Sequence, residues 1–179
     1  CPSAGTKGTG SADNGRMKLE FADADGTSST LLAALHAQCF SEGWREDAFA
    51  SLLAMPGAFA LILGPGSEDN GGAVATPVGF ALARAIGGES EIITLGVLPG
   101  RREKGVGAAL VAAVAAKARD MASAELFLEV AADNVAAIAL YKATGFVAVG
   151  RRKDYYQNKN ATDAGNVSQI DAIVMRRTL

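Results

Sequence analysis

The chain has 179 residues, 49% hydrophobic and 20% charged, with a formal net charge of −2 at pH 7. This length and composition predict one globular domain with a hydrophobic core and exclude a disordered protein. The slightly negative charge argues against direct binding to nucleic acid. The two cysteines and the one histidine lack metal-ligand spacing, so we expect no metal site. His36 falls in the middle of a predicted helix, and we assign it a structural role.

The beginning of the chain differs in composition from the rest. Residues 1–16 are rich in Gly, Ser and Thr without an apolar period, which predicts a flexible leader or an added extension before a single domain over 17–179. The longest apolar run, residues 105–116, is too short and too Ala-rich to span a membrane. The low cysteine content is typical of a reducing compartment, so we expect a cytoplasmic protein without membrane association.

In the first half of the chain, hydrophobic periodicity and turn residues predict a strand, two helices and three further strands. The strands are expected over residues 18–22, 58–63, 78–86 and 91–98, and the second helix over 44–55. The first helix begins after the capping residues 25–29 and carries on its apolar face Leu31, Leu32, Leu35 and Cys39.

In the second half of the chain, the same signals predict a helix, a strand, a helix and two strands. The helix over 105–120 is apolar nearly all round, so we expect it to be buried against the sheet. The strand over 125–130 places Leu126, Leu128 and Val130 on one face and Phe127 and Glu129 on the other. A helix capped near Asn134 runs through Lys142 and ends at Gly145, and the strands 146–151 and 171–177 flank a polar loop over 157–169. This order predicts a mixed α+β sheet, with a parallel strand pair flanking the helix that starts at Gly105.

A basic, glycine-bearing turn over residues 101–108 joins a strand to a long helix. Free N–H groups at a helix N-terminus attract anions, and Gly105 and Gly107 let a phosphate approach the backbone. The residues therefore predict pyrophosphate binding, with a capped core helix as the alternative. A Walker loop is absent, and Leu110 occupies the third glycine position of a dinucleotide fingerprint.

The wider pattern V-x-P-x-x-R-x-x-G-x-G, read from Val97 to Gly107, resembles the acetyl-CoA pyrophosphate loop of the GNAT acyltransferases. The resemblance continues through the segments 128–130, 134–141, 145–146, 155–156 and 171–175. That succession resembles the bacterial ribosomal-protein alanine N-acetyltransferases of the RimI type, over roughly residues 17–179. The resemblance implies a GNAT-type fold, which is a mixed, mostly antiparallel central sheet flanked by helices.

The resemblance also implies acetyl-CoA as co-substrate. It assigns cofactor binding to Leu95, Gly96, Val97, Arg102, Glu103, Lys104, Gly105, Val106, Gly107, Ala108 and Asn134. The strand 95–97 is expected to separate from its neighbour, so that the N–H of Val97 polarises the acetyl carbonyl. Asn134 is equally well explained as a helix cap.

Two residues are candidates for the proton transfers. Glu129 interrupts an apolar strand, where a carboxylate is costly unless water or a partner reaches it. The resemblance makes it the general base, and a solvated residue on an edge strand is the alternative. Tyr141 follows Asn134 by two helical turns and matches the family's general acid. Its alternative is a tyrosine packed at a helix end.

The acceptor implied by the resemblance is the α-amine of an Ala-starting protein, such as a small-subunit ribosomal protein. Weaker candidates for its binding are Cys39, Phe40, Trp44, Arg152, Tyr155 and Tyr156. Gly43 stands where the family commonly has proline directly before the tryptophan, so the peptide preference stays open. Acetylation of a small-molecule amine or a lysine side chain is the alternative activity. A non-catalytic acyl-CoA-binding module is disfavoured because both Glu129 and Tyr141 are present.

Overall fold

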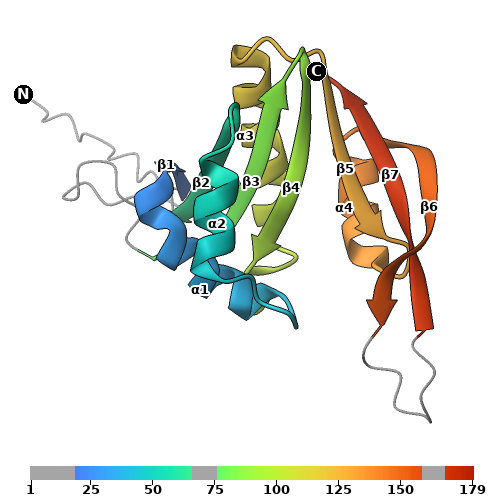
Figure 1. Cartoon of the computed structure of the whole chain (residues 1–179), viewed down its shortest axis with the longest axis horizontal. Helices are drawn as coiled ribbons and strands as arrows, with labels where there is room; N and C mark the ends of the chain where they lie inside the picture. The colour runs from blue at the N-terminus through green and yellow to red at the C-terminus, as the bar shows by residue number, and fades with distance from the viewer. Residues whose placement is uncertain (1–18, 66–75, 159–167) are drawn as a thin grey trace, which may run out of the picture.

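The computed structural model describes residues 19–65, 76–158 and 168–179, which form one seven-stranded sheet with four α-helices (Figure 1). The strands are β1 (Leu19–Ala24), β2 (Ala58–Pro65), β3 (Gly79–Ile86), β4 (Glu89–Val97), β5 (Glu125–Ala131), β6 (Val147–Asn158) and β7 (Ser168–Thr178). The helices are α1 (Ser29–Cys39), α2 (Glu46–Leu53), α3 (Val106–Asp120) and α4 (Val135–Ala143). The leader over 1–16 and most of the polar loop over 157–169 lie outside the described residues.

The strand order is β1-β2-β3-β4-β5-β7-β6, and every neighbouring pair is antiparallel except β4 and β5. A parallel pair needs a crossover connection, and α3 supplies it. The predicted mixed, mostly antiparallel sheet is therefore confirmed, as is the parallel pair flanking α3.

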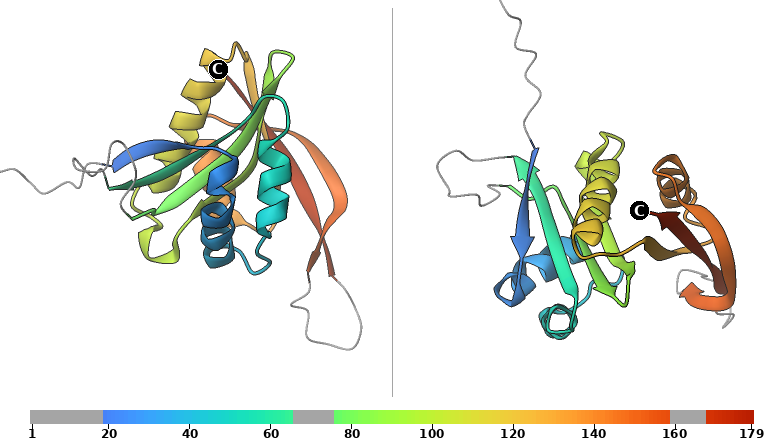
Figure 2. Two further views of the ribbon diagram at one scale, coloured as in Figure 1. Left: turned by 60° about the vertical axis from the view of Figure 1, so that its left-hand side comes forward. Right: turned by 90° about the horizontal axis from the view of Figure 1, so that it is seen from above.

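Helices cover both faces of the sheet. Figure 2 shows α1 and α2 on one side of the strands and α3 and α4 on the other. Each side has its own apolar cluster: Leu110, Val114 and Leu126 belong to the cluster under α3, and Leu32 and Phe49 belong to the cluster under α1 and α2.

The sequence predicted the buried faces of the helices only in part. In α1 the buried residues are Ser29, Leu32, Leu35 and His36, while Leu31 is 41% exposed. The expected place of Leu31 on the apolar face was wrong, because the residues at i, i+3, i+6 and i+7 from Ser29 face the sheet. In α3 the residues Ala112 and Ala116 are exposed, so this helix is buried on one face and not all round.

The last two strands are longer than the sequence predicts, with 12 residues in β6 and 11 in β7. The register of β6 against β7 shifts between Arg152 and Tyr156. Asp154 lies inside this shift with φ at 56°, and its N–H donates to Oδ1 of Asp171 over 3.0 Å. A bulge thus lets the strand continue beyond residue 151, where we expected it to end.

The ladder between β4 and β5 is short. It pairs Glu89–Ile92 with Glu125–Leu128 and then stops, although both strands continue. The register of β4 against β3 shifts here, because Thr94 pairs with Leu82 and Ile92 with Ala83, which leaves Ile93 as an extra residue. Such a bulge bends its strand. The bend at Ile93 accounts for the gap that opens between β4 and β5.

Gly57, in the turn between α2 and β2, offers a test of the packing. Its φ is 77°, and a Cβ there would lie 1.8 Å from the carbonyl oxygen of Ala85. We expect Gly57→Ala to lower the free energy of unfolding by about 3 kcal/mol or more, measured by urea denaturation. The matched control is Gly88→Ala, at φ 86° with no atom within 4 Å, which should cost only about 1 kcal/mol. Equal losses would show that the contact with Ala85 does not constrain the fold.

Candidate active site

A cavity of about 450 Å³, which we call the loop cavity, lies between the end of β4 and the start of α3. Its lining residues are Cys39, Phe40, Leu95, Gly96, Val97, Arg102, Glu103, Gly105, Gly107, Ala108, Asn134, Ala136, Ala137 and Leu140. The structure thus brings nine of the eleven residues predicted for cofactor binding to one cavity.

The loop cavity borders an uncapped helix N-terminus. Gly105 precedes α3 with φ at 78° and provides no side-chain cap, and the first helical bond runs from the N–H of Ala109 to the carbonyl of Gly105 over 3.0 Å. Three N–H groups, of Val106, Gly107 and Ala108, therefore have no partner within the helix. Oriented N–H groups at the positive end of a helix dipole are a binding site for a phosphate.

The two other predicted residues, Lys104 and Val106, do not line the loop cavity. The Nζ of Lys104 donates to the carbonyl of Gly100 over 3.2 Å, and Lys104 does not line the cavity. The side chain of Val106 is only 4% exposed and packs in the core. The guanidinium of Arg102 donates to two carbonyls, Nε to Val97 over 3.1 Å and Nη2 to Cys39 over 3.2 Å. Arg102, which lines the loop cavity, therefore joins the end of β4 to the end of α1.

The backbone of β4 presents donors to the gap. The N–H of Leu98 donates to the carbonyl of Val78, on the β3 side, over 3.0 Å. Successive N–H groups of a strand point to opposite sides, so those of Val97 and Leu95 point toward β5. The β5 ladder has ended by then, and the described part of β5 offers them no paired residue. The expected separation of residues 95–97 is therefore present.

A second cavity of about 600 Å³, the gap cavity, passes between the separated strands. Its lining residues are His36, Phe40, Ser41, Glu42, Trp44, Ile92, Ile93, Thr94, Leu95, Leu128, Glu129, Val130, Ala131, Asn134, Ala137, Tyr141 and Ile170. His36 and Tyr141 come from helices on opposite faces of the sheet, which is why the cavity must run through it. The gap cavity shares Phe40, Leu95, Asn134 and Ala137 with the loop cavity, so the two adjoin.

The structure brings the two proposed catalytic residues to this one cavity. The Glu129 side chain, on β5, is 17% exposed, and its Oε1 lies 3.1 Å from the Nε of Arg152. This ion pair provides the partner that a carboxylate inside an apolar strand requires. Arg152 also lies over the ring of Tyr155, 5.5 Å from its centroid. The side chain of Tyr156 is outside the described residues.

Tyr141 is held by the end of α4. The N–H of Phe146 donates to the carbonyl of Tyr141 over 2.9 Å, and the N–H of Gly145 donates to the carbonyl of Lys142 over 3.1 Å. These two bonds, with Gly145 at φ 92°, form a Schellman motif, and the rings of Tyr141 and Phe146 meet 5.7 Å apart. Gly145 thus ends the helix as predicted, and the motif fixes Tyr141 in the wall of the gap cavity.

Asn134 performs the capping role that was left open. Its Oδ1 accepts the N–H of Ala137 over 3.1 Å at the start of α4. It also lines both cavities, so capping and ligand contact are compatible.

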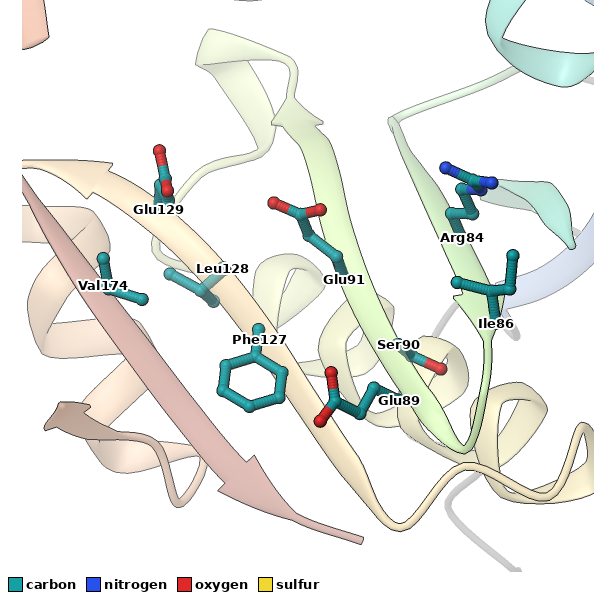
Figure 3. Close-up of a pocket in the computed structure, with 9 residues that line it drawn as sticks. All are labelled: Arg84, Ile86, Glu89, Ser90, Glu91, Phe127, Leu128, Glu129 and Val174. Carbon is teal, nitrogen blue, oxygen red and sulfur yellow. The ribbon is translucent and has the colours of Figure 1, made fainter. Parts of the chain in front are cut away.

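A third cavity of about 290 Å³, the edge groove, continues from Glu129 along the paired part of β4 and β5. Figure 3 shows Glu91 reaching from β4 toward β5, with Glu129 beyond it and Arg84 on β3. Partial burial raises the pKa of Glu91 and the charge of Glu129 raises it further, while Arg152 and Arg84 act in the opposite direction. Sequence reasoning missed Glu91, although it begins a predicted strand two residues after Glu89, a spacing that could have indicated two carboxylates on one face of the sheet.

Within residues 19–65, 76–158 and 168–179, no group of three or more His, Cys, Asp or Glu side chains could hold a metal ion. None of the described helices has the length and apolar character needed to cross a membrane.

Comparison with known proteins agrees with this geometry. The sequence profile of the acetyltransferase (GNAT) family matches residues 30–146. The N-alpha-acetyltransferase RimI of Mycobacterium tuberculosis is 36% identical over 151 residues, which cover 81% of this chain and 83% of the relative.

Solved structures show the same fold. The ribosomal-protein-S18-alanine N-acetyltransferase from Escherichia coli superposes with a TM-score of 0.74 at 25% identity, over 90% of this chain and 94% of that one. Arabidopsis thaliana NAA60, solved in complex with acetyl-CoA, has a TM-score of 0.72 at 18% identity, over 90% of this chain and 99% of that one, and shows a likeness of fold alone. From the family profile and the close relative, the chain belongs to the GNAT family and is an acetyl-CoA-dependent N-acetyltransferase.

Proposed function

We propose that the protein acetylates the N-terminal α-amine of another protein, with an Ala-starting small-subunit ribosomal protein as the favoured acceptor, and that it does so in the cytoplasm. The observation that carries the proposal is that the cavity at the α3 N-terminus adjoins the cavity lined by Glu129 and Tyr141. The names of two relatives, an N-alpha-acetyltransferase and an S18-alanine N-acetyltransferase, support the choice of acceptor.

The loop cavity fits acetyl-CoA. The N–H groups of Gly107 and Ala108, which line it and have no partner within α3, suit the pyrophosphate, and its apolar side chains suit the pantetheine arm. Acetyl-CoA supplies the activated acetyl group. The N–H of Val97, which points into the gap, would donate to the carbonyl oxygen as negative charge develops there.

Glu129 is the proposed general base. An α-amine has a pKa of about 8, so removing its proton near neutral pH is a small step. The carboxylate lines the cavity that joins the acceptor side to the thioester side, and Arg152 holds it in place. It takes one proton from the ammonium group, directly or through water, and leaves the amine neutral for attack.

Tyr141 is the proposed general acid. Its hydroxyl group would give a proton to the departing thiolate, whose thiol has a pKa of about 8.5 against about 10 for a phenol. The Schellman motif at Gly145 and Phe146 fixes the helix end that carries it.

Glu129→Gln should lower kcat for acetyl transfer by about 10² to 10⁴, the usual worth of a general base, with little change in acetyl-CoA affinity. The deficit should shrink at high pH, where the amine is already neutral. Glu125→Gln is the matched control, because Glu125 lies on the same strand and pairs with Arg176 over 3.0 Å but lines none of the three cavities. A Glu129→Gln variant that keeps the full rate at neutral pH would remove Glu129 from the mechanism.

Tyr141→Phe should impair kcat by about 10² or more while the protein stays folded and binds acetyl-CoA, because only a hydroxyl group is lost. Steady-state kinetics, calorimetric titration and thermal melting separate these effects. Lys142→Ala, at an exposed side chain on the same helix that lines none of the three cavities, is the control and should act like the wild type. Wild-type kcat in the Tyr141→Phe variant would leave Tyr141 with a packing role only.

The acceptor is tested by an acetylation panel with mass detection. We expect Ala-starting peptides to react faster than the same peptides with larger first residues, and blocked peptides with free lysines to be poor acceptors. If lysine side chains or small amines react best, the N-terminal assignment fails and the acetyltransferase assignment survives.

A further inference from the structure

His36 is the one histidine of the chain, and the proposed transfer chemistry does not use it. It lies on α1 with only 3% of its surface exposed, and it lines the gap cavity. Its Nδ1 accepts the backbone N–H of Trp44 over 3.1 Å. A ring nitrogen that accepts a hydrogen bond carries no proton, so the neutral imidazole here must be protonated on Nε2.

Aromatic rings enclose the imidazole. Phe40 stacks on it at 4.2 Å and Trp44 at 4.8 Å between centroids, with interplanar angles of 23° and 19°. Two nearly parallel rings at these distances must lie on opposite faces of the imidazole. Phe49 on α2 and Phe80 on β3 approach within 5.7 and 6.0 Å.

These contacts hold the segment 40–45 that joins α1 to α2. The segment contributes Phe40, Ser41, Glu42 and Trp44 to the wall of the gap cavity. Gly43 packs so closely that a Cβ there would lie 3.0 Å from the Cβ of Ala37. The wall thus packs against α1 at Gly43. It also contacts both faces of the His36 imidazole and donates a hydrogen bond to its Nδ1.

We propose that His36 is a positioning residue for the acceptor: its neutral imidazole holds the 40–45 wall closed, and proton uptake releases that wall. The proposal takes the gap cavity as the acceptor site and to that extent rests on the proposed function. A protonated Nδ1 would point an N–H at the N–H of Trp44, so the hydrogen bond would be lost. In the closed wall the stacked rings attract the imidazolium cation. In the open wall water hydrates that cation, which offsets this attraction.

The ionisable groups around His36 do not change this direction. Those that line the gap cavity with His36 are Glu42 in the wall, Glu129 on β5 and Tyr141 on α4. Burial, and not a neighbouring charge, lowers the pKa of His36 below its ordinary value of 6.5. His36 therefore binds a proton more readily in the unfolded chain or behind an open wall than in the closed wall. The closed wall is fully stable above pH 6.5, and it loses stability as the pH falls from 6.5 through the lowered pKa of His36.

The sequence provides a direct probe, because Trp44 is the one tryptophan. In the untagged wild type, Trp44 fluorescence should change with a one-proton midpoint below 6.5 while far-UV circular dichroism stays constant. His36→Asn should remove this transition, because its Oδ1 can accept the Trp44 N–H at every pH. Gln38→Ala, on the exposed side of α1, should titrate like the wild type.

Kinetics provide the second readout. His36→Leu should raise KM for an Ala-starting peptide by about 3- to 10-fold, the worth of one hydrogen bond, with kcat and the acetyl-CoA KM unchanged, and His36→Asn should restore much of the loss. No fluorescence transition in the wild type, the same transition in His36→Asn, or a wild-type peptide KM in a folded His36→Leu variant would each overturn the proposal. The fluorescence titration needs no substrate, so it decides the role of His36 even if the peptide is not acetylated and the proposed function fails.

Discussion

The hydrogen-bond ladder between β4 and β5 ends after Ile92 and Leu128, and the arrangement of the site depends on that break. Two strands can separate within a sheet only if each keeps a partner on its other side. β4 stays paired with β3 as far as Val97, and β5 stays paired with β7 as far as Ala131. The unpaired backbone of β4 then lies beside a cavity, where a ligand can satisfy it.

The elements around the gap keep it open and give its two ends different chemistry. Arg102 joins the end of β4 to the end of α1, and the uncapped start of α3 offers N–H groups to an anion. On the acceptor side, Arg152 orients the Glu129 carboxylate and the Schellman motif orients Tyr141. The aromatic stack on His36 closes the remaining wall. A cavity at an anion-attracting helix end therefore adjoins a cavity lined by Glu129 and Tyr141.

Much of this arrangement could be predicted from the sequence, because it follows from patterns among neighbouring residues. The order of the elements, the Gly105 turn and the end of α4 at Gly145 each follow from residues close together in the chain. The bulge at Ile93 left no such signal, since residues 91–98 read as one regular strand. The bridging role of Arg102 was also hidden, because its partner Cys39 lies 63 residues away. Glu91 was missed for a similar reason, as its environment depends on which strand lies beside it.

The backbone of β4 provides the most direct test of the account. Amide hydrogen exchange should show Leu98 protected by its bond to Val78 and Val97 exchanging fast, since its N–H points into the gap. Acetyl-CoA should then slow exchange at Val97 and at residues 106–108, with far less effect at Leu98. If Val97 is already protected in the free protein, or if acetyl-CoA leaves its exchange unchanged, the gap between β4 and β5 is not the site of the acetyl group.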